Sequence, residues 1–198
     1  MASNKLISIA KNNLDDLINL LKFDYVRGYL FTEADIQFSV IRHLYNSLSK
    51  KDDRWFVGAE HVLKIKSTDK KWKPDISCFY LPQKLSKFIE DQERYLVAVI
   101  EIKYWKNPLS DLKKLTSIQR SKDCLVWSIF ANHFDSTIHQ KYAEQSNDYQ
   151  SEVEKWIQRS PEKRGATIIK CDRIPKSKRF SKYSDRVEAL REHFWIND

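Results

Sequence analysis

The apolar run at 96–100 (LVAVI) constrains this chain more than any other feature of its sequence. Five consecutive apolar residues place hydrophobic side chains on both faces of a strand, so both faces must be covered by protein. Helices packed on the two sides of a sheet provide such cover in α/β proteins. We therefore predict a central strand over 95–104.

The segments around this strand alternate between helical and extended patterns. The order of helix, three strands, helix and strand predicts an α/β (α+β) fold with one central mixed sheet flanked by helices. Apolar residues at helical spacing predict helices over 13–21, 32–48 and 109–121, the second capped by Thr32. Strand-forming runs predict strands over 54–65, 73–80, 124–131 and 166–171. The polar segment 81–94 is compatible with helix, and helices are predicted over 136–159 and 184–195.

The length of 198 residues fits one domain. No internal repeat, low-complexity stretch or linker divides the chain. We expect a core at about 31–131, with a C-terminal and largely helical addition at 132–198 packed on the same domain.

Glycine and cysteine content excludes several kinds of site. The three glycines, at positions 28, 58 and 165, lie too far apart to form a GxGxxG motif or a P-loop. The three cysteines, at positions 78, 124 and 171, are odd in number and surrounded by apolar residues. They are typical of small buried side chains in a reducing compartment, not of a zinc site or a disulfide framework.

The formal net charge of +8 favours an anionic partner, whether nucleic acid, an anionic membrane or an acidic protein. No apolar run is long enough to span a membrane, and the first residues lack a signal-peptide pattern. We therefore expect a cytoplasmic protein without a membrane partner.

Charged residues at the ends of two predicted strands form the candidate site. Residues two apart in a strand share a face, so Glu101 and Lys103 point the same way at the end of the central strand. If the strand at 73–80 is its neighbour, Asp75 comes opposite Glu101. Glu33, in the first turn of the helix at 32–48, is a further acidic candidate.

Two close carboxylates repel each other unless a cation lies between them. Two carboxylates, a backbone carbonyl and water molecules suit Mg²⁺ or Mn²⁺, whose remaining positions can take phosphate oxygens. A lysine beside such an ion can orient or help to deprotonate an attacking water, or stabilise the charge that grows on the phosphate.

The pattern Pro74-Asp75 followed by Glu101-Ile102-Lys103 resembles the PD-(D/E)XK phosphodiesterase superfamily, which has the restriction-endonuclease-like fold (αβββαβ). The resemblance covers about 31–131. It implies metal ligation by Asp75, Glu101 and the Ile102 carbonyl, and a catalytic Lys103. It also implies that Glu33 holds a second metal or binds the water molecules of the first.

The resemblance further implies a Mg²⁺- or Mn²⁺-dependent endonuclease acting on DNA, with RNA left open as a substrate. The helix at 109–121 would flank the site, although the sequence assigns no role to its Asp111 or Gln119. Whether the chain acts as a homodimer or with a partner subunit is also left open.

Simpler interpretations stand beside each of these. Glu101 and Lys103 could form an ion pair on an edge strand, and Pro74-Asp75 a strand-entry turn. Glu33 could complement the helix dipole. Lys73, Lys106 and Lys113 could contact phosphate or belong to solvated surface. The chain as a whole could be a non-catalytic nucleic-acid-binding module that retains the nuclease fold, or a basic protein with an acidic protein partner.

Overall fold

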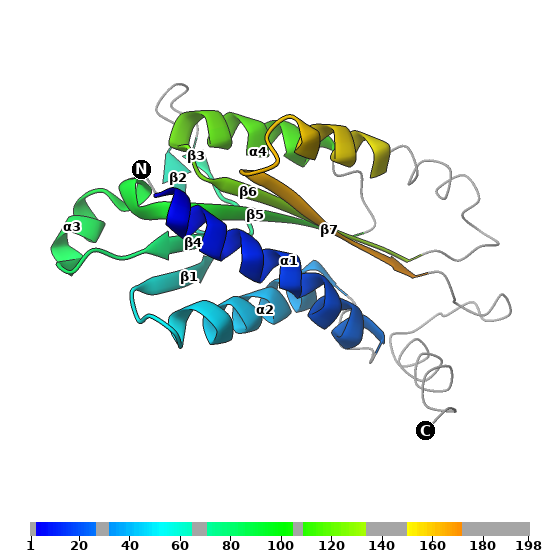
Figure 1. Cartoon of the computed structure of the whole chain (residues 1–198), viewed down its shortest axis with the longest axis horizontal. Helices are drawn as coiled ribbons and strands as arrows, with labels where there is room; N and C mark the ends of the chain where they lie inside the picture. Colours follow the sequence, from blue (N-terminus) through cyan, green and yellow to red (C-terminus); the bar gives the residue numbers. More distant parts are fainter. Residues whose placement is uncertain (1–2, 27–31, 65–70, 105–108, 134–149, 172–198) are drawn as a thin grey trace, which may run out of the picture.

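The computed structural model describes residues 3–26, 32–64, 71–104, 109–133 and 150–171. A five-stranded mixed sheet lies at its centre, in the order β1-β4-β5-β6-β7 (Figure 1). The strands are β1 (Trp55–Ala59), β4 (Ile76–Tyr80), β5 (Leu96–Tyr104), β6 (Leu125–His133) and β7 (Arg164–Cys171). β1, β4 and β5 are mutually antiparallel, whereas β5, β6 and β7 run parallel. The predicted α/β fold with an open mixed sheet flanked by helices is confirmed.

The predicted central strand is β5, the middle strand of the sheet. Its residues 96–100 are all buried, and between them they contribute side chains to the cores on both faces. Ala98, Ile100 and Ile102 belong to one core, and Leu96 and Val99 to the other. The run of apolar residues therefore reflects cover on both faces.

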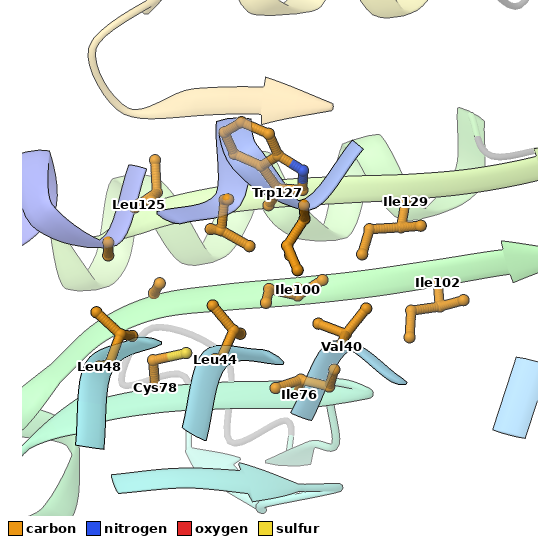
Figure 2. Close-up of a cluster of buried hydrophobic side chains, with 14 of the residues drawn as sticks. Val40, Leu44, Leu48, Ile76, Cys78, Ile100, Ile102, Leu125, Trp127 and Ile129 are labelled. Atoms are coloured by element: carbon orange, nitrogen blue, oxygen red, sulfur yellow. The ribbon is translucent and has the colours of Figure 1, made fainter. Parts of the chain in front are cut away.

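Two N-terminal helices cover the first face. α1 (Asn4–Val26) lies over β5, β6 and β7, and α2 (Glu33–Leu44), continued by the π-helical turn η1 (Tyr45–Ser49), lies over β1 and β5. Thr32 and Asp35 form the predicted capping box at the start of α2. Figure 2 shows the helical side chains of this core facing the strands; its labelled members are Val40, Leu44, Leu48, Ile76, Cys78, Ile100, Ile102, Leu125, Trp127 and Ile129.

α4 (Leu109–Lys122) and a helix over residues 150–158 cover the other face (Figure 1). α4 buries Leu112, Leu115 and Ile118 against β5 and β6. Trp156 donates a hydrogen bond from its indole N–H to the Thr116 hydroxyl at 2.9 Å, which joins the second helix to α4. Between β4 and β5 the chain forms the short helix α3 (Leu85–Glu90) and the 3-10 turn η2 (Gln92–Tyr95).

The first helix and the first strand differ in their bounds from those predicted. The helix predicted over 13–21 begins at Asn4 and extends to Val26. The strand predicted over 54–65 ends at Ala59, because Glu60 adopts a left-handed conformation with φ of 48° that a strand cannot continue through. Residues beyond it form a separate two-stranded ribbon of β2 (Leu63–Lys64) and β3 (Lys71–Trp72).

The C-terminal part of the chain adds to the sheet as well as to its helical cover. The strand predicted over 166–171 begins two residues earlier, at Arg164, and forms the edge strand β7 beside β6. The helix predicted over 136–159 is seen at 150–158, and its earlier residues lie outside the described ranges. The helix predicted over 184–195 also lies outside them. Within those ranges, no helix is both long enough and apolar enough to cross a membrane.

The close packing of β7 against β6 predicts the effect of Gly165→Ala. Gly165 pairs with Trp127, and a Cβ atom there would lie 2.0 Å from Cζ3 of the Trp127 ring. The indole N–H of Trp127 is bonded to the Thr167 hydroxyl at 2.9 Å, so the ring cannot move without losing that bond. We expect the free energy of unfolding, measured by urea denaturation, to fall by about 3 kcal/mol.

Gly58→Ala is the matched control. Its added Cβ would meet only the ring of Phe56, at 3.1 Å, and this ring is 41% exposed and can move. Its cost should stay below about 1 kcal/mol. Equal costs for the two variants would contradict the packing argument.

Candidate active site

The three residues at the centre of the prediction meet at the end of β5, on the face covered by α4. Val99 belongs to the core beneath α4. Glu101 and Lys103 follow it at intervals of two residues, so their side chains lie on the same face of β5. Glu101 is only 5% exposed, whereas the side chain of Lys103 is 22% exposed. The prediction that the two side chains share one face is confirmed.

Asp75 joins them from the start of the neighbouring strand. Ile76 pairs with Ile100, so the register brings Asp75 opposite Glu101. Oδ2 of Asp75 accepts a hydrogen bond of 2.6 Å from the backbone N–H of Ile102, continuing the link between β4 and β5 past the last paired residues. The N–H and C=O of one strand residue project toward the same edge, so the Ile102 carbonyl also faces the Asp75 side.

Helix α2 brings Glu33 to the same end of the sheet. Gln37 donates a hydrogen bond of 2.6 Å from Nε2 to the carbonyl oxygen of Asp75. Glu33 is one helical turn before Gln37, on the same face of α2. Its negative charge contributes to the raised pKa values of both Asp75 and Lys103, which places it within electrostatic range of the group.

Helix α4 contributes Asp111, a residue to which the sequence assigned no role. Asp111 lies in the first turn of α4 and is 1% exposed. Its Oδ2 lies 3.2 Å from Nζ of Lys103, and its Oδ1 lies 3.2 Å from Nζ of Lys114. The sequence signal was weak, because an acidic residue in the first turn of a helix is common on electrostatic grounds alone.

The carboxyl groups perturb one another strongly. Burial, followed by the charges of Asp75 and Asp111, raises the pKa of Glu101 to about 8. Burial also raises the pKa of Asp75, against the lowering effect of its hydrogen bond from Ile102 and of the Lys103 charge. The fold therefore holds two carboxyl groups where their charged forms are disfavoured unless positive charge is supplied.

Lys103 has the opposite balance. Its partial burial alone would lower its pKa, but the nearby carboxylates, Asp111 foremost, outweigh burial and raise the pKa above its ordinary value. The side chain is therefore a cation at neutral pH. It can donate hydrogen bonds and stabilise negative charge.

The oxygen donors at this end of the sheet are of the kind that could hold a divalent cation. Oε1 of Glu101 is buried and has no hydrogen-bond partner in the part of the chain that the structure describes. A cation at that oxygen would relieve the repulsion between Glu101 and Asp75, and the Ile102 carbonyl is a third oxygen nearby. Among the described residues, no three side chains of His, Cys, Asp or Glu are grouped to hold a metal ion, so Glu33 does not complete such a trio.

The other residues considered from the sequence do not join the carboxyl groups in the described part of the structure. Lys73 and Lys113 are exposed, with Lys73 paired to Glu60, and Lys106 lies outside the described residues. Gln119 does not reach the carboxylates. It accepts a hydrogen bond of 2.8 Å from Nε of the buried Arg164 and donates one of 2.9 Å to Ser160.

A cavity of about 700 Å³ lies apart from this group. It is bounded by α1, η1 and the start of β1, and its lining includes Tyr80 at the end of β4 opposite to Asp75. The carboxyl groups of the candidate site, those of Asp75, Glu101 and Asp111, do not line it. The chemistry-bearing residues therefore lie at one end of the sheet and this hollow at the other.

Comparison of the chain with protein-family models, curated proteins and solved structures gave no significant match. The interpretation of the site therefore rests on its own geometry and chemistry.

The raised pKa of Glu101 predicts that Glu101→Gln stabilises the protein as the pH rises. The folded-state pKa is about 8 against an ordinary value of 4.5, so stability from the neutral form is complete below pH 4.5 and is lost as the pH approaches 8. The glutamine amide does not ionise, so the variant does not lose this stability as the pH rises. At one pKa unit per about 1.4 kcal/mol, the variant should gain about 2–5 kcal/mol over wild type between pH 5 and 8.

Urea unfolding across this pH range, with a chelator present, measures the difference. Glu152→Gln, at an exposed glutamate paired with Lys155, is the control and should show a difference that does not change with pH. A constant difference for Glu101→Gln would show that this carboxyl is not perturbed.

Proposed function

We propose that this chain is a metal-dependent nuclease that hydrolyses phosphodiester bonds in DNA, with Mg²⁺ or Mn²⁺ as its cofactor. The supporting observation is the meeting of two perturbed carboxyl groups and one lysine ammonium at a single end of the sheet. Such a group serves a reaction in which a cation must be held beside an anionic substrate.

The arrangement of elements supports membership of the PD-(D/E)XK superfamily. The elements that build the central sheet follow the order α2, β1, β4, β5, α4, β6, with the small ribbon β2–β3 inserted after β1. This is the αβββαβ order of the restriction-endonuclease-like core. Asp75 directly precedes the second strand of that order, and Glu101-Ile102-Lys103 lies on the third, which is consistent with the proposed membership.

Asp75, Glu101 and the Ile102 carbonyl would hold the cation. When bound, a divalent cation polarises the phosphate and makes a water molecule acidic enough to attack phosphorus. The chain itself holds the two carboxylates together: the Ile102 N–H fixes one oxygen of Asp75, and Gln37 fixes its backbone. Glu33, on the same face of α2, would bind the water molecules around the cation.

Lys103 acts as a cation in this proposal. Its ammonium lies on the face of the carboxylates, where it orients the attacking water and stabilises the charge that develops on the phosphate during in-line attack. The exposed Lys73 and Lys113 would contact the phosphate backbone on either side, together with Lys106.

The group also weighs against the non-catalytic alternative. A module that only binds nucleic acid needs positive surface charge and has no use for buried carboxyl groups. Keeping Glu101 and Asp75 buried together costs stability at neutral pH, so a chain with no use for a cation would gain by replacing either of them.

Cleavage assays with Lys103→Ala test the proposal. Supercoiled plasmid, linear duplex, single-stranded DNA and RNA are incubated with the protein and Mg²⁺ or Mn²⁺, with EDTA as the metal-free arm. We expect EDTA-sensitive cleavage of DNA, reduced at least about 100-fold by Lys103→Ala, because the variant loses a charge that acts in the transition state.

Lys155→Ala is the matched control, since Lys155 is an exposed lysine on the helix at 150–158. It should cleave within about twofold of wild type. DNA binding without cleavage by the wild type would instead identify a binding module, and cleavage of RNA alone would change the substrate. A further check is that Mn²⁺ raises the melting temperature of wild type but not of Glu101→Gln.

A further inference from the structure

We propose that Asp111 is the positioning residue that holds the Lys103 ammonium beside the carboxylates and thereby sets the turnover rate. The effect on the turnover rate rests on the proposed nuclease function. The structural part of the inference, that Asp111 fixes Lys103, stands on the ion pair between the start of α4 and the end of β5.

Asp111 is more deeply buried than a charged residue at the start of a helix usually is. Aspartate is rarely buried unless it is paired, and Asp111 is 1% exposed although it lies in the first turn of a helix, where such residues usually face solvent. Each oxygen has a different lysine as its ion-pair partner, and the buried Oδ2 accepts no hydrogen bond within the described residues. Oδ2 lies 3.2 Å from Lys103, and Oδ1 lies 3.2 Å from Lys114, with the Ser110 hydroxyl at 3.4 Å.

The two lysines are not equivalent. Lys114 lies one turn along α4 from Asp111 and is 54% exposed, so its pairing is a surface contact of little energy. Lys103 is only 22% exposed and comes from another element. The buried side of Asp111 therefore faces the lysine of the sheet.

A lysine needs such a partner if its position matters. Its four-carbon stem is flexible, and an unpaired ammonium would turn toward solvent. Displacement of a reacting group by about 1 Å can cost on the order of 100-fold in rate. Asp111, carried by a helix docked on the sheet, supplies a fixed counter-charge that limits where the ammonium can be.

Docking of α4 does not itself require this ion pair. Leu112, Leu115 and Ile118 bury the helix against β5 and β6. Removing the charge of Asp111 should therefore release Lys103 without detaching α4, and this separates a positioning role from a purely structural one.

The test compares Asp111→Asn, which is nearly isosteric, with Asp123→Asn. Asp123 lies just past the other end of α4, is paired with Lys163 and has a φ of 51°, which asparagine tolerates. The control makes the same change in net charge away from the carboxylates. Both variants are assayed for cleavage of linear duplex DNA with Mg²⁺.

Acetylation supplies a readout that does not depend on cleavage. Free protein is labelled with a limiting amine-acetylating reagent at one pH, and modification of Lys103 is quantified by peptide mass spectrometry against Lys155 as internal standard. We expect Asp111→Asn to raise the labelling of Lys103 at least fivefold and to lower kcat about 10- to 100-fold, with KM for DNA within about twofold. Asp123→Asn should change neither quantity.

Unchanged labelling of Lys103 in Asp111→Asn, or raised labelling with unchanged kcat, would overturn the proposal. An inactive wild type would refute the nuclease function separately, while the labelling still decides whether Asp111 fixes Lys103. If Asp111→Asn does not fold, Asp111→Glu carries the test. It keeps the charge, so Lys103 should stay protected, but its longer arm moves the ammonium and should lower kcat severalfold.

Discussion

The burial of β5 on both faces is the constraint on which the rest of this structure depends. Helices α1 and α2 close one face, and α4 with the helix at 150–158 closes the other. A strand in this position has no solvent along most of its length, so a charge near its end is partly desolvated. Glu101 has this position, and burial is the largest cause of its raised pKa. The scaffold that makes the fold stable also makes the end of β5 electrostatically unusual.

The charges at that end compensate one another only in part. The carboxylates around Lys103 keep its side chain a cation. Among them, Asp111 places Oδ2 at 3.2 Å from the Lys103 Nζ atom. The same cation does not fully offset Asp75 and Glu101, whose pKa values remain raised. Additional positive charge beside Asp75 and Glu101 would therefore stabilise their ionised forms. This is the physical basis for proposing a divalent cation there. In the proposed reaction, the carboxylates of Asp75 and Glu101 would hold this cation, and the Lys103 ammonium would act on the phosphodiester.

Local patterns were good guides wherever a single element decided the outcome. Thr32 and Asp35 indicated the start of α2, and the strand over 95–104 and the helix over 109–121 are close to their observed bounds. The start of α1 was missed although Ile7, Ala10, Leu14, Leu17 and Leu21 recur at helical spacing and are all buried. The end of β1 could not be predicted, because Glu60 takes its left-handed conformation where its backbone N–H donates to the Asp75 carbonyl, a contact made by tertiary packing.

The sequence by itself indicated that Glu101 and Lys103 share one face of a buried strand, because side chains in a strand alternate and the apolar run favours a central strand over an edge strand. It also indicated Asp75 as their neighbour, since an antiparallel partner strand brings the two ends together. Only the tertiary structure decided that Asp111 pairs with Lys103, that Gln37 holds the Asp75 backbone, and that Gln119 belongs to a different cluster. The physical reason is that strand periodicity is a property of local backbone geometry. The turn of a helix that faces a given strand residue depends instead on how the whole helix packs across the sheet.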